Sequence, residues 1–308
     1  MVTSAPLWSV LVVPAVLAGF AAVAVLADAV LAARAAGRPA RLAAAGPVAG
    51  AARLLVAQRR VTLAPDALLW RLGLWTVPAA GMLAALVIPF GTVTASRMRV
   101  GVVWFNAMEV LTWAGLWMAG WGANSALSLI GGYRFVAQGL AYELPLMFAL
   151  ISAATGAQSL NVADIVAAQS HLWFAVWMPA AFIVYLASVY AFTFLGPFAY
   201  PVGADLAGGV LAELSGVDRL VIEAGRWLLL AAGAGMAVPL FLGGGAGPAL
   251  PAWAWSAVKT LAVLALLTWG RRRLPVLRAD RYAELAWVVL IPLSVGQALV
   301  PALVDLTR

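Results

Sequence analysis

The sequence predicts an all-α integral membrane protein of about eight transmembrane helices, forming a single membrane domain over residues 1–308. Of the 308 residues, 65% are hydrophobic and only 10% are charged, whereas soluble domains carry about 25% charged residues. The apolar residues gather in stretches of about 20, which is the length a helix needs to cross a hydrocarbon core of about 30 Å. The mean hydropathy of +0.99 agrees with this pattern. Lipid is therefore the solvent expected for most of the chain.

Eight apolar stretches are predicted to cross the membrane as helices, because backbone in lipid must satisfy its own hydrogen bonds. A barrel strand would alternate in polarity, and these stretches do not. The first stretch has no basic segment before it and is too long for a cleavable signal peptide, so we expect it to stay in the protein. The predicted spans are residues 7–33, 72–91, 101–121, 136–156, 173–195, 221–242, 252–270 and 284–304.

The arginines predict the orientation, because cytoplasmic loops of membrane proteins are rich in Arg and Lys. The first loop holds Arg34, Arg38, Arg41, Arg53, Arg59, Arg60 and Arg71. The seventh holds Arg271, Arg272, Arg273, Arg278 and Arg281. The even-numbered loops hold only Arg97 and Arg99. Odd-numbered loops are thus expected in the cytoplasm of a bacterium and both termini outside its plasma membrane, and the net charge of +7 needs no nucleic-acid partner.

Two connecting segments have a recognisable composition. In the long first loop, apolar side chains lie among basic ones, which predicts a short amphipathic helix on the membrane surface; they are Arg53, Leu54, Leu55, Val56, Arg59 and Arg60. The glycine-rich residues 243–247 have no following Lys-Ser or Lys-Thr, so they are expected to form an exterior turn and no phosphate loop.

The residue content excludes the common protein-bound redox centres. The chain has no Cys and a single His, His171. Iron–sulfur clusters need thiolates, and a membrane haem of the b type or a zinc site needs more than one His. We therefore expect no cofactor or metal on this chain. His171 lies beside Trp173 and Trp177 and is predicted to be an interfacial residue in an aromatic belt.

Ionisable side chains inside the predicted spans are the first candidates for function, because each one is costly in lipid. They are Asp28, Glu109, Glu143, Glu223, Arg226 and Lys259. Asp28 and Lys259 have an equally good explanation as residues near helix ends that reach the interface. Glu223 and Arg226 are three residues apart on one helix face and are predicted to form an ion pair.

Glu143 is the strongest of these candidates. It lies in an apolar run with no basic neighbour, two residues before Pro145. A proline inside a helix frees a backbone carbonyl and kinks the helix, which can open a polar pocket. The sequence therefore predicts a proton-relay role for Glu143.

Several motifs resemble the H subunit, the quinone-site membrane subunit, of the bacterial NADH-quinone oxidoreductase, respiratory complex I. Residues 119–125 read A-G-W-G-A-N-S, residues 131–134 G-G-Y-R and residues 137–143 A-Q-G-L-A-Y-E. These are similar to that family's A-G-W-x-S-N-S, G-G-x-R and A-Q-x-x-S-Y-E. Further matches in the same order are S-L-N-V-A-D-I-V-A-A-Q (159–169), Pro197-Phe198, E-L-S-G (213–216) and R-A-D-R-Y (278–282).

This resemblance implies a location and a role. The chain would form the roof of the quinone chamber, where the membrane arm joins the electron-carrying arm, and would contribute to a proton path. Quinone would be the substrate; other membrane-arm subunits and the soluble quinone-site module would be partners. Iron–sulfur clusters and flavin would lie in partner subunits. The resemblance implies coupling candidates Glu143, Glu223, Asp205 and Glu213, and chamber or docking candidates Arg38, Arg134, Pro197, Phe198, Arg278 and Arg281.

The departures from the family pattern bear on mechanism. The family's A-E-T-N-R-x-P-F-D-L-P loop reads A-F-T-F-L-G-P-F-A-Y-P here, over residues 191–201, so its Glu, Arg and Asp are absent. Arg226 stands where the family has a carboxylate. Two other functions stay open: the equivalent subunit of a membrane-bound hydrogenase or formate hydrogenlyase, and a standalone cation or proton transporter. Inverted repeats, which many transporters contain, are not recognisable.

Overall fold

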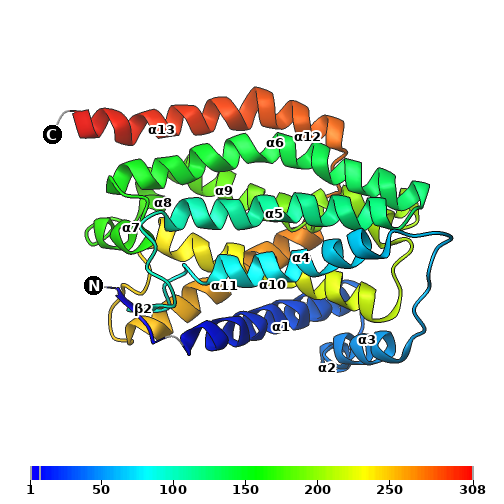
Figure 1. The fold of residues 1–308 in the computed structure, drawn as a ribbon. Helices are drawn as coiled ribbons and strands as arrows, with labels where there is room; N and C mark the ends of the chain where they lie inside the picture. The colour runs from blue at the N-terminus through cyan, green and yellow to red at the C-terminus, as the bar shows by residue number, and fades with distance from the viewer. Residues whose placement is uncertain (1, 7, 307–308) are drawn as a thin grey trace.

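The computed structural model describes residues 2–6 and 8–306, and these form a bundle of roughly parallel helices (Figure 1). Six segments are long and apolar enough to cross a membrane. They are α1 (Ser9–Ala35), α4 (Ala67–Ala85), α6 (Ala126–Ala157), α10 (Gly216–Phe241), α11 (Ala252–Arg273) and the final segment Ala279–Leu306. Beside them run α5 (Gly101–Gly122) and the shorter α9 (Pro179–Phe192), so eight segments of the described chain run along the bundle.

The ends of the bundle differ in character. Both chain termini lie at one end, which we call the terminal end (Figure 1). The opposite, arginine-rich end carries α2 (Ala40–Ala43), α3 (Ala45–Val56) and four short 3₁₀ helices that connect α9 to α10. These are η1 (Gly196–Phe198), η2 (Tyr200–Val202), η3 (Ala204–Leu206) and η4 (Gly209–Leu211).

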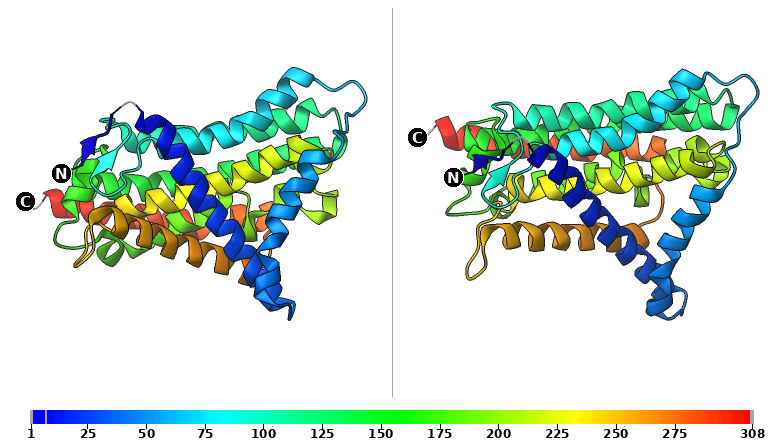
Figure 2. Two further views of the ribbon diagram at one scale, coloured as in Figure 1. Left: turned by 90° about the horizontal axis from the view of Figure 1, so that it is seen from below. Right: turned by 60° about the horizontal axis from the view of Figure 1, so that its bottom comes forward.

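The core surrounds α10. Most of this helix is buried, whereas α1 and α13 (Ile291–Leu306) are mainly exposed. Figure 1 shows α1 and α13 on opposite edges of the bundle, and Figure 2 shows α1 crossing obliquely towards α2 and α3. Long apolar helices with so little buried surface would be unfavourable in water, so we expect lipid or a partner to cover them. The all-helical membrane fold expected from the sequence is confirmed.

Small residues set the distance between α4 and α5. A Cβ atom placed on Gly73 would lie 2.5 Å from the carbonyl oxygen of Gly115. A Cβ atom on Gly122 would lie 2.5 Å from the backbone nitrogen of Trp70. The two backbones are therefore in direct contact, which is how helices associate in lipid when no hydrophobic effect drives them together.

Several predicted boundaries were wrong. The second span, expected at 72–91, is Ala67–Ala85, because Asp66 caps its start with bonds from the amides of Leu68 and Leu69. The fourth, expected at 136–156, begins at Ala126 and is 32 residues long. That length corresponds to about 48 Å, so α6 projects beyond a hydrocarbon core of about 30 Å.

Three of the later spans also differ from the prediction. The fifth, expected to be continuous over 173–195, breaks at Met178 into α8 (Phe174–Trp177) and α9, because Pro179 disfavours helical backbone at the residue before it. The sixth, expected at 221–242, begins five residues earlier, at Gly216. The last begins at Ala279 and consists of α12 (Ala279–Leu285), a π-helical turn (Ala286–Leu290) and α13.

Segments outside the spans complete the fold. The short helix expected in the first loop is present as α3, which ends at Val56, so Arg59 and Arg60 follow it. Its apolar residues Leu55 and Val56 are exposed. At the terminal end, β1 (Thr3–Ser4) pairs in parallel with β2 (Val93–Thr94). Helix α7 (Val162–Ala168) follows α6 at the same end.

Candidate functional site

The buried Glu109 and the half-buried Glu143 share a hydrogen-bonded cluster between α5 and α6. Glu109 on α5 is only 2% exposed. The hydroxyl of Tyr142 on α6 donates to its Oε1 atom. The indole Nε1 of Trp113 donates to the Tyr142 oxygen at 2.7 Å and to Glu109 Oε1 at 3.3 Å. The sequence identified Glu109 as an ionisable side chain that is costly to place in lipid. It could not show that Tyr142, 33 residues away, is the hydrogen-bond partner of Glu109.

Glu143 belongs to the same cluster. Its Oε1 atom accepts a hydrogen bond of 2.7 Å from Asn106 Nδ2, and the two carboxyl groups are close enough to interact electrostatically. The Oε2 atoms of Glu109 and Glu143 are both buried and have no hydrogen-bond partner among the described residues. No Lys or Arg in the described chain forms an ion pair with either group.

The cluster lies near the middle of the bundle. Tyr142 is 16 residues from the first residue of α6 and 15 from the last. Each half of the helix is therefore about 24 Å long, which places the cluster at membrane depth whichever way the chain inserts.

A line of polar side chains leads from this cluster to the arginine-rich end. Tyr142, Gln138 and Arg134 are spaced four residues apart and so share one face of α6 over about 12 Å. Gln138 is buried and donates to the carbonyl oxygen of Ala191 at 2.8 Å. Arg134 donates to Asp205 Oδ2 at 2.7 Å, and its guanidinium lies 3.8 Å from the centre of the Tyr200 ring.

The two predicted acids of the α9–α10 connection both have partners. The hydrogen bond from Arg134 holds the pKa of Asp205 below its ordinary value, although its side chain is 54% exposed. Glu213 Oε1 accepts a hydrogen bond of 2.7 Å from the hydroxyl of Ser125, at the start of α6. Both acids therefore fasten the connection to α6.

The predicted docking residues lie at the arginine-rich end but make different contacts. Pro197 accepts a backbone hydrogen bond from Leu277, and the Phe198 ring packs edge-on against Tyr282, with centroids 4.4 Å apart. The exposed Arg278 and Arg281 form ion pairs within their own segment, with Asp280 at 3.2 Å and Glu284 at 3.1 Å.

Arg38 differs from these residues. It is exposed after the end of α1 and forms no ion pair with any residue that the structure describes.

The ion pair predicted on the sixth span is present. Arg226 Nη1 lies 3.1 Å from Glu223 Oε2. Arg226 also donates through Nη2 to the carbonyl oxygen of Phe194 at 2.6 Å, and its guanidinium lies 4.6 Å from the centre of the Phe194 ring. The buried Arg226 therefore contacts the same loop in which Phe192, Leu195 and Ala199 stand where the family pattern has Glu, Arg and Asp.

Asp28 and Lys259, for which the sequence left two explanations, are both buried and bonded. Asp28 on α1 is 7% exposed and binds Arg272 Nε at 2.7 Å, with Arg271 as a second partner. Lys259 on α11 donates to three backbone carbonyls after α10, those of Leu242 (2.6 Å), Gly244 (2.9 Å) and Ala246 (2.7 Å). Neither residue reaches the interface as a free charge. His171, in contrast, lies exposed in the loop before α8.

A small polar hollow lies at the arginine-rich end, where the α3–α4 connection meets the start of α10. Its volume is about 170 Å³, and Arg59, Arg60, Arg71, Trp70 and Asp218 line it. Arg59 holds Asp218 in a forked interaction with contacts of 2.6 to 3.0 Å. The indole nitrogen of Trp70 is buried and has no partner among the described residues. Trp70, which lines the hollow, therefore carries an unused hydrogen-bond donor.

Comparison with known proteins identifies the family. The family model for NADH dehydrogenase matches residues 8–302, nearly the whole chain. An H subunit of the NADH-quinone oxidoreductase of Geobacter metallireducens is 35% identical over 243 residues, which cover 75% of this chain and 73% of that protein. The chain belongs to the family of complex I H subunits. The H subunit of Geobacillus kaustophilus is 33% identical over 83% of this chain and 79% of its own length.

A solved structure shares the fold of this complex I relative. A chain of an archaeal respiratory membrane complex, the membrane-bound sulfane sulfur reductase, superposes with a TM-score of 0.80 over 95% of this chain and 99% of its own. The two chains are only 21% identical. The same fold therefore also occurs in a complex described as a sulfur reductase, so the fold by itself does not identify the substrate.

Proposed function

We propose that this complex I relative couples quinone reduction to proton movement in a complex I-type assembly. Its arginine-rich end would form the roof of the quinone chamber, and α5 and α6 would carry protons towards the membrane centre. The observation that supports this most directly is the cluster of the buried Glu109 and Tyr142 with the half-buried Glu143. Ionisable groups held inside a membrane bundle without a counter-charge are typical of proton relays.

The line of polar side chains on α6 supplies the route. Carboxyl and hydroxyl groups can each donate and accept a hydrogen bond, so a chain of them can pass a proton onward. The proposed path begins at Asp205 and Arg134, passes Gln138 and reaches Tyr142, Glu109 and Glu143. An amide such as Gln138 does not itself carry a proton, so water beside it would complete this step.

The hollow beside Trp70 supports a quinone-facing surface. A quinone carbonyl oxygen is a hydrogen-bond acceptor, and the Trp70 indole is a buried donor without a partner in the described chain. Arg60 and Arg71 line the same hollow and would stabilise negative charge on a reduced quinone. The electrons would come from iron–sulfur clusters and flavin in partner subunits.

The proton path can be tested by removing each carboxylate while keeping its shape. Glu143→Gln and Glu109→Gln should each abolish most of the proton movement per quinone reduced, with assembly intact. Glu284→Gln is the matched control, because Glu284 is an exposed carboxylate of α12. Proton uptake and quinone reduction would be measured together in vesicles that contain the whole complex. Full coupling in both cluster variants would disprove the proposed path.

The partners can be tested by purification in mild detergent. Co-purification with other membrane-arm subunits and a soluble quinone-site module is the expected result. A nickel-site hydrogenase subunit in their place would assign the chain to a hydrogenase-type complex. Isolation of a solitary, active transporter would contradict membership of any such assembly.

A further inference from the structure

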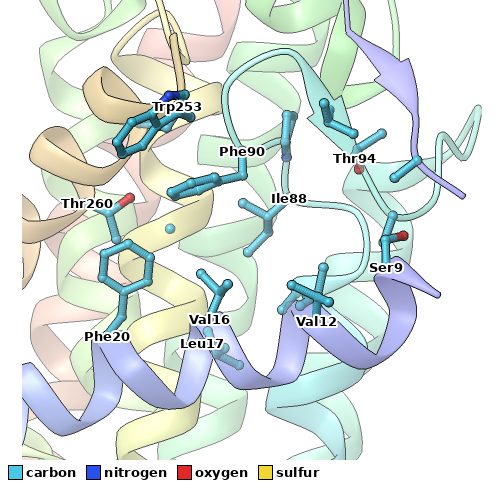
Figure 3. Close-up of a pocket in the computed structure, with 18 of the residues that line it drawn as sticks. Ser9, Val12, Val16, Leu17, Phe20, Ile88, Phe90, Thr94, Trp253 and Thr260 are labelled. Atoms are coloured by element: carbon cyan, nitrogen blue, oxygen red, sulfur yellow. The ribbon is translucent and has the colours of Figure 1, made fainter. Parts of the chain in front are cut away.

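A narrow apolar slot opens at the terminal end of the bundle, between α1, α4, α10 and α11. It has a volume of about 320 Å³. Val12, Val16 and Phe20 line it from α1, Ile88 from the segment after α4 and Trp253 from α11 (Figure 3). Val238 lines it from α10. No described residue of α5 or α6, along which the proposed proton path runs, lines the slot.

The length of the slot corresponds to half a membrane. Its α1 wall runs from Ser9 to Phe20 (Figure 3), which is 12 residues, and the two ends are therefore about 16 Å apart along the helix axis. Half of a hydrocarbon core of about 30 Å is about 15 Å. A cavity volume of about 320 Å³ is smaller than that of a helix segment of this length, which is about 10–12 Å across with its side chains. A protein helix does not fit, but a hydrocarbon chain does.

The mouth of the slot faces the surroundings of the bundle. Val12 is 43% exposed and Val16 is 39% exposed, on a helix whose apolar length is mostly uncovered. An apolar cavity of this kind does not hold water, because water needs two or more polar partners. In a bilayer the slot is therefore open to lipid.

One end of the slot carries an unused polar group. Ser9, the first residue of α1, is 7% exposed, and its hydroxyl has no hydrogen-bond partner among the described residues. Two other hydroxyls of the lining are bonded to backbone, that of Thr94 to the carbonyl of Leu86 and that of Ser256 to the amide of Gly91. A buried hydroxyl without a partner indicates a missing acceptor or donor.

We propose that the slot binds one acyl chain of a membrane phospholipid, from the leaflet at the terminal end, and that the Ser9 hydroxyl donates to the ester carbonyl of that chain. The ester lies where the hydrocarbon core begins, as Ser9 does, and the chain then runs along α1 towards Phe20. The lipid fills the space between α1 and the buried α10, so α1 is held to the bundle partly through a lipid.

The test uses the full chain with the subunits that co-purify with it, and native mass spectrometry to count and identify bound phospholipids. Gly235→Leu should remove one lipid, because a Cβ atom at Gly235 meets only the Ile88 side chain, 3.5 Å away, and a longer side chain would enter the slot. Val16→Phe narrows the mouth and provides a second filling variant. Val23→Phe is the matched control, since Val23 is 48% exposed on α1 and does not line the slot.

Ser9→Ala tests the polar contact separately. Loss of one neutral hydrogen bond should speed lipid release about two- to tenfold, without emptying the slot. Equal lipid counts in the filling variants and Val23→Phe would overturn the proposal. A bound isoprenoid quinone or a detergent molecule in place of a phospholipid would overturn it as well, and the measured mass distinguishes these cases.

Discussion

Arg226 shows how one buried charge is accommodated at the residue scale. Its guanidinium has three partners from two segments: the carboxylate of Glu223, the carbonyl of Phe194 and the ring of Phe194. Arginine suits such a site because it is always charged and presents five donors in a planar fork. Phe194, which stands where the family pattern has a polar residue, therefore stabilises the buried Arg226 together with Glu223.

A double-mutant cycle can measure this pairing. Glu223→Gln should destabilise the protein by about 1–3 kcal/mol, below the ~3–5 kcal/mol of a fully buried pair, because the Glu223 side chain is 30% exposed. Glu223→Leu combined with Arg226→Leu should recover much of that loss. Thermal unfolding of the detergent-solubilised protein would report the coupling energy. Additive single effects would show that the two side chains do not depend on each other.

The sequence predicted individual site residues better than it predicted which residues contact them. Glu143 could be selected because its neighbours are apolar and Pro145 follows it. The partners of Asp28 could not be found, because Arg271 and Arg272 are more than 240 positions away and only the packing of α1 against α11 brings them together. Sequence order contains no direct signal for such contacts.

The contact between α4 and α5 illustrates the element scale. These helices approach through glycines, so their association depends on the absence of side chains at a few positions. Hydropathy detects such helices but does not measure how closely they pack, and a glycine in an apolar run can equally face lipid. Gly73 packs against the backbone of α5, whereas Gly19 has open space around the position of an added Cβ atom.

Substitution of these glycines should therefore have opposite results. Gly73→Ala should destabilise the fold by about 1–3 kcal/mol, as overpacking does in close-packed interiors, because its methyl group would meet the Gly115 carbonyl. Gly19→Ala should be neutral or stabilising by up to about 1 kcal/mol, because no atom lies within 4 Å of the added Cβ. The melting temperatures of the two variants would measure this difference in stability. Equal values would show that α4 and α5 can move apart without loss of stability.

Other element boundaries were recoverable in part. Pro179 marks the break between α8 and α9, yet the apolar run continues through it, so hydropathy alone predicted one long span. Asp66 is an ordinary helix N-cap and would have placed the start of α4 correctly. The projection of α6 beyond the membrane depends on contacts with η2 and η4, which the sequence pattern does not contain.

At the scale of the whole molecule, the arginines decide how the chain is oriented. The two ends of the bundle differ as the sequence predicted, with the arginine-rich loops at one end and both termini at the other (Figure 1). The number of crossing segments in the described chain is even, which is consistent with termini on one side. The placement of the termini outside the cell is still a prediction from the distribution of charge.

The absence of cysteine makes this orientation easy to test. Leu250 and Leu274 flank α11 at opposite ends and are exposed by 49% and 52%. A membrane-impermeant maleimide should label Leu250→Cys in intact cells and Leu274→Cys only after the cells are opened. The unmodified chain, with no Cys, is the control. The reverse pattern would place both termini in the cytoplasm.

Lys259 fills a position at the terminal end that a dissolved cation could otherwise occupy. Three carbonyl oxygens that converge on one cation resemble the coordination shell that backbone provides for sodium or potassium. Here the ammonium of Lys259 occupies that position and is covalently attached to the chain. The turn between α10 and α11 therefore binds a cation that belongs to the chain itself. We expect this part of the protein to keep its fold without a dissolved sodium or potassium ion.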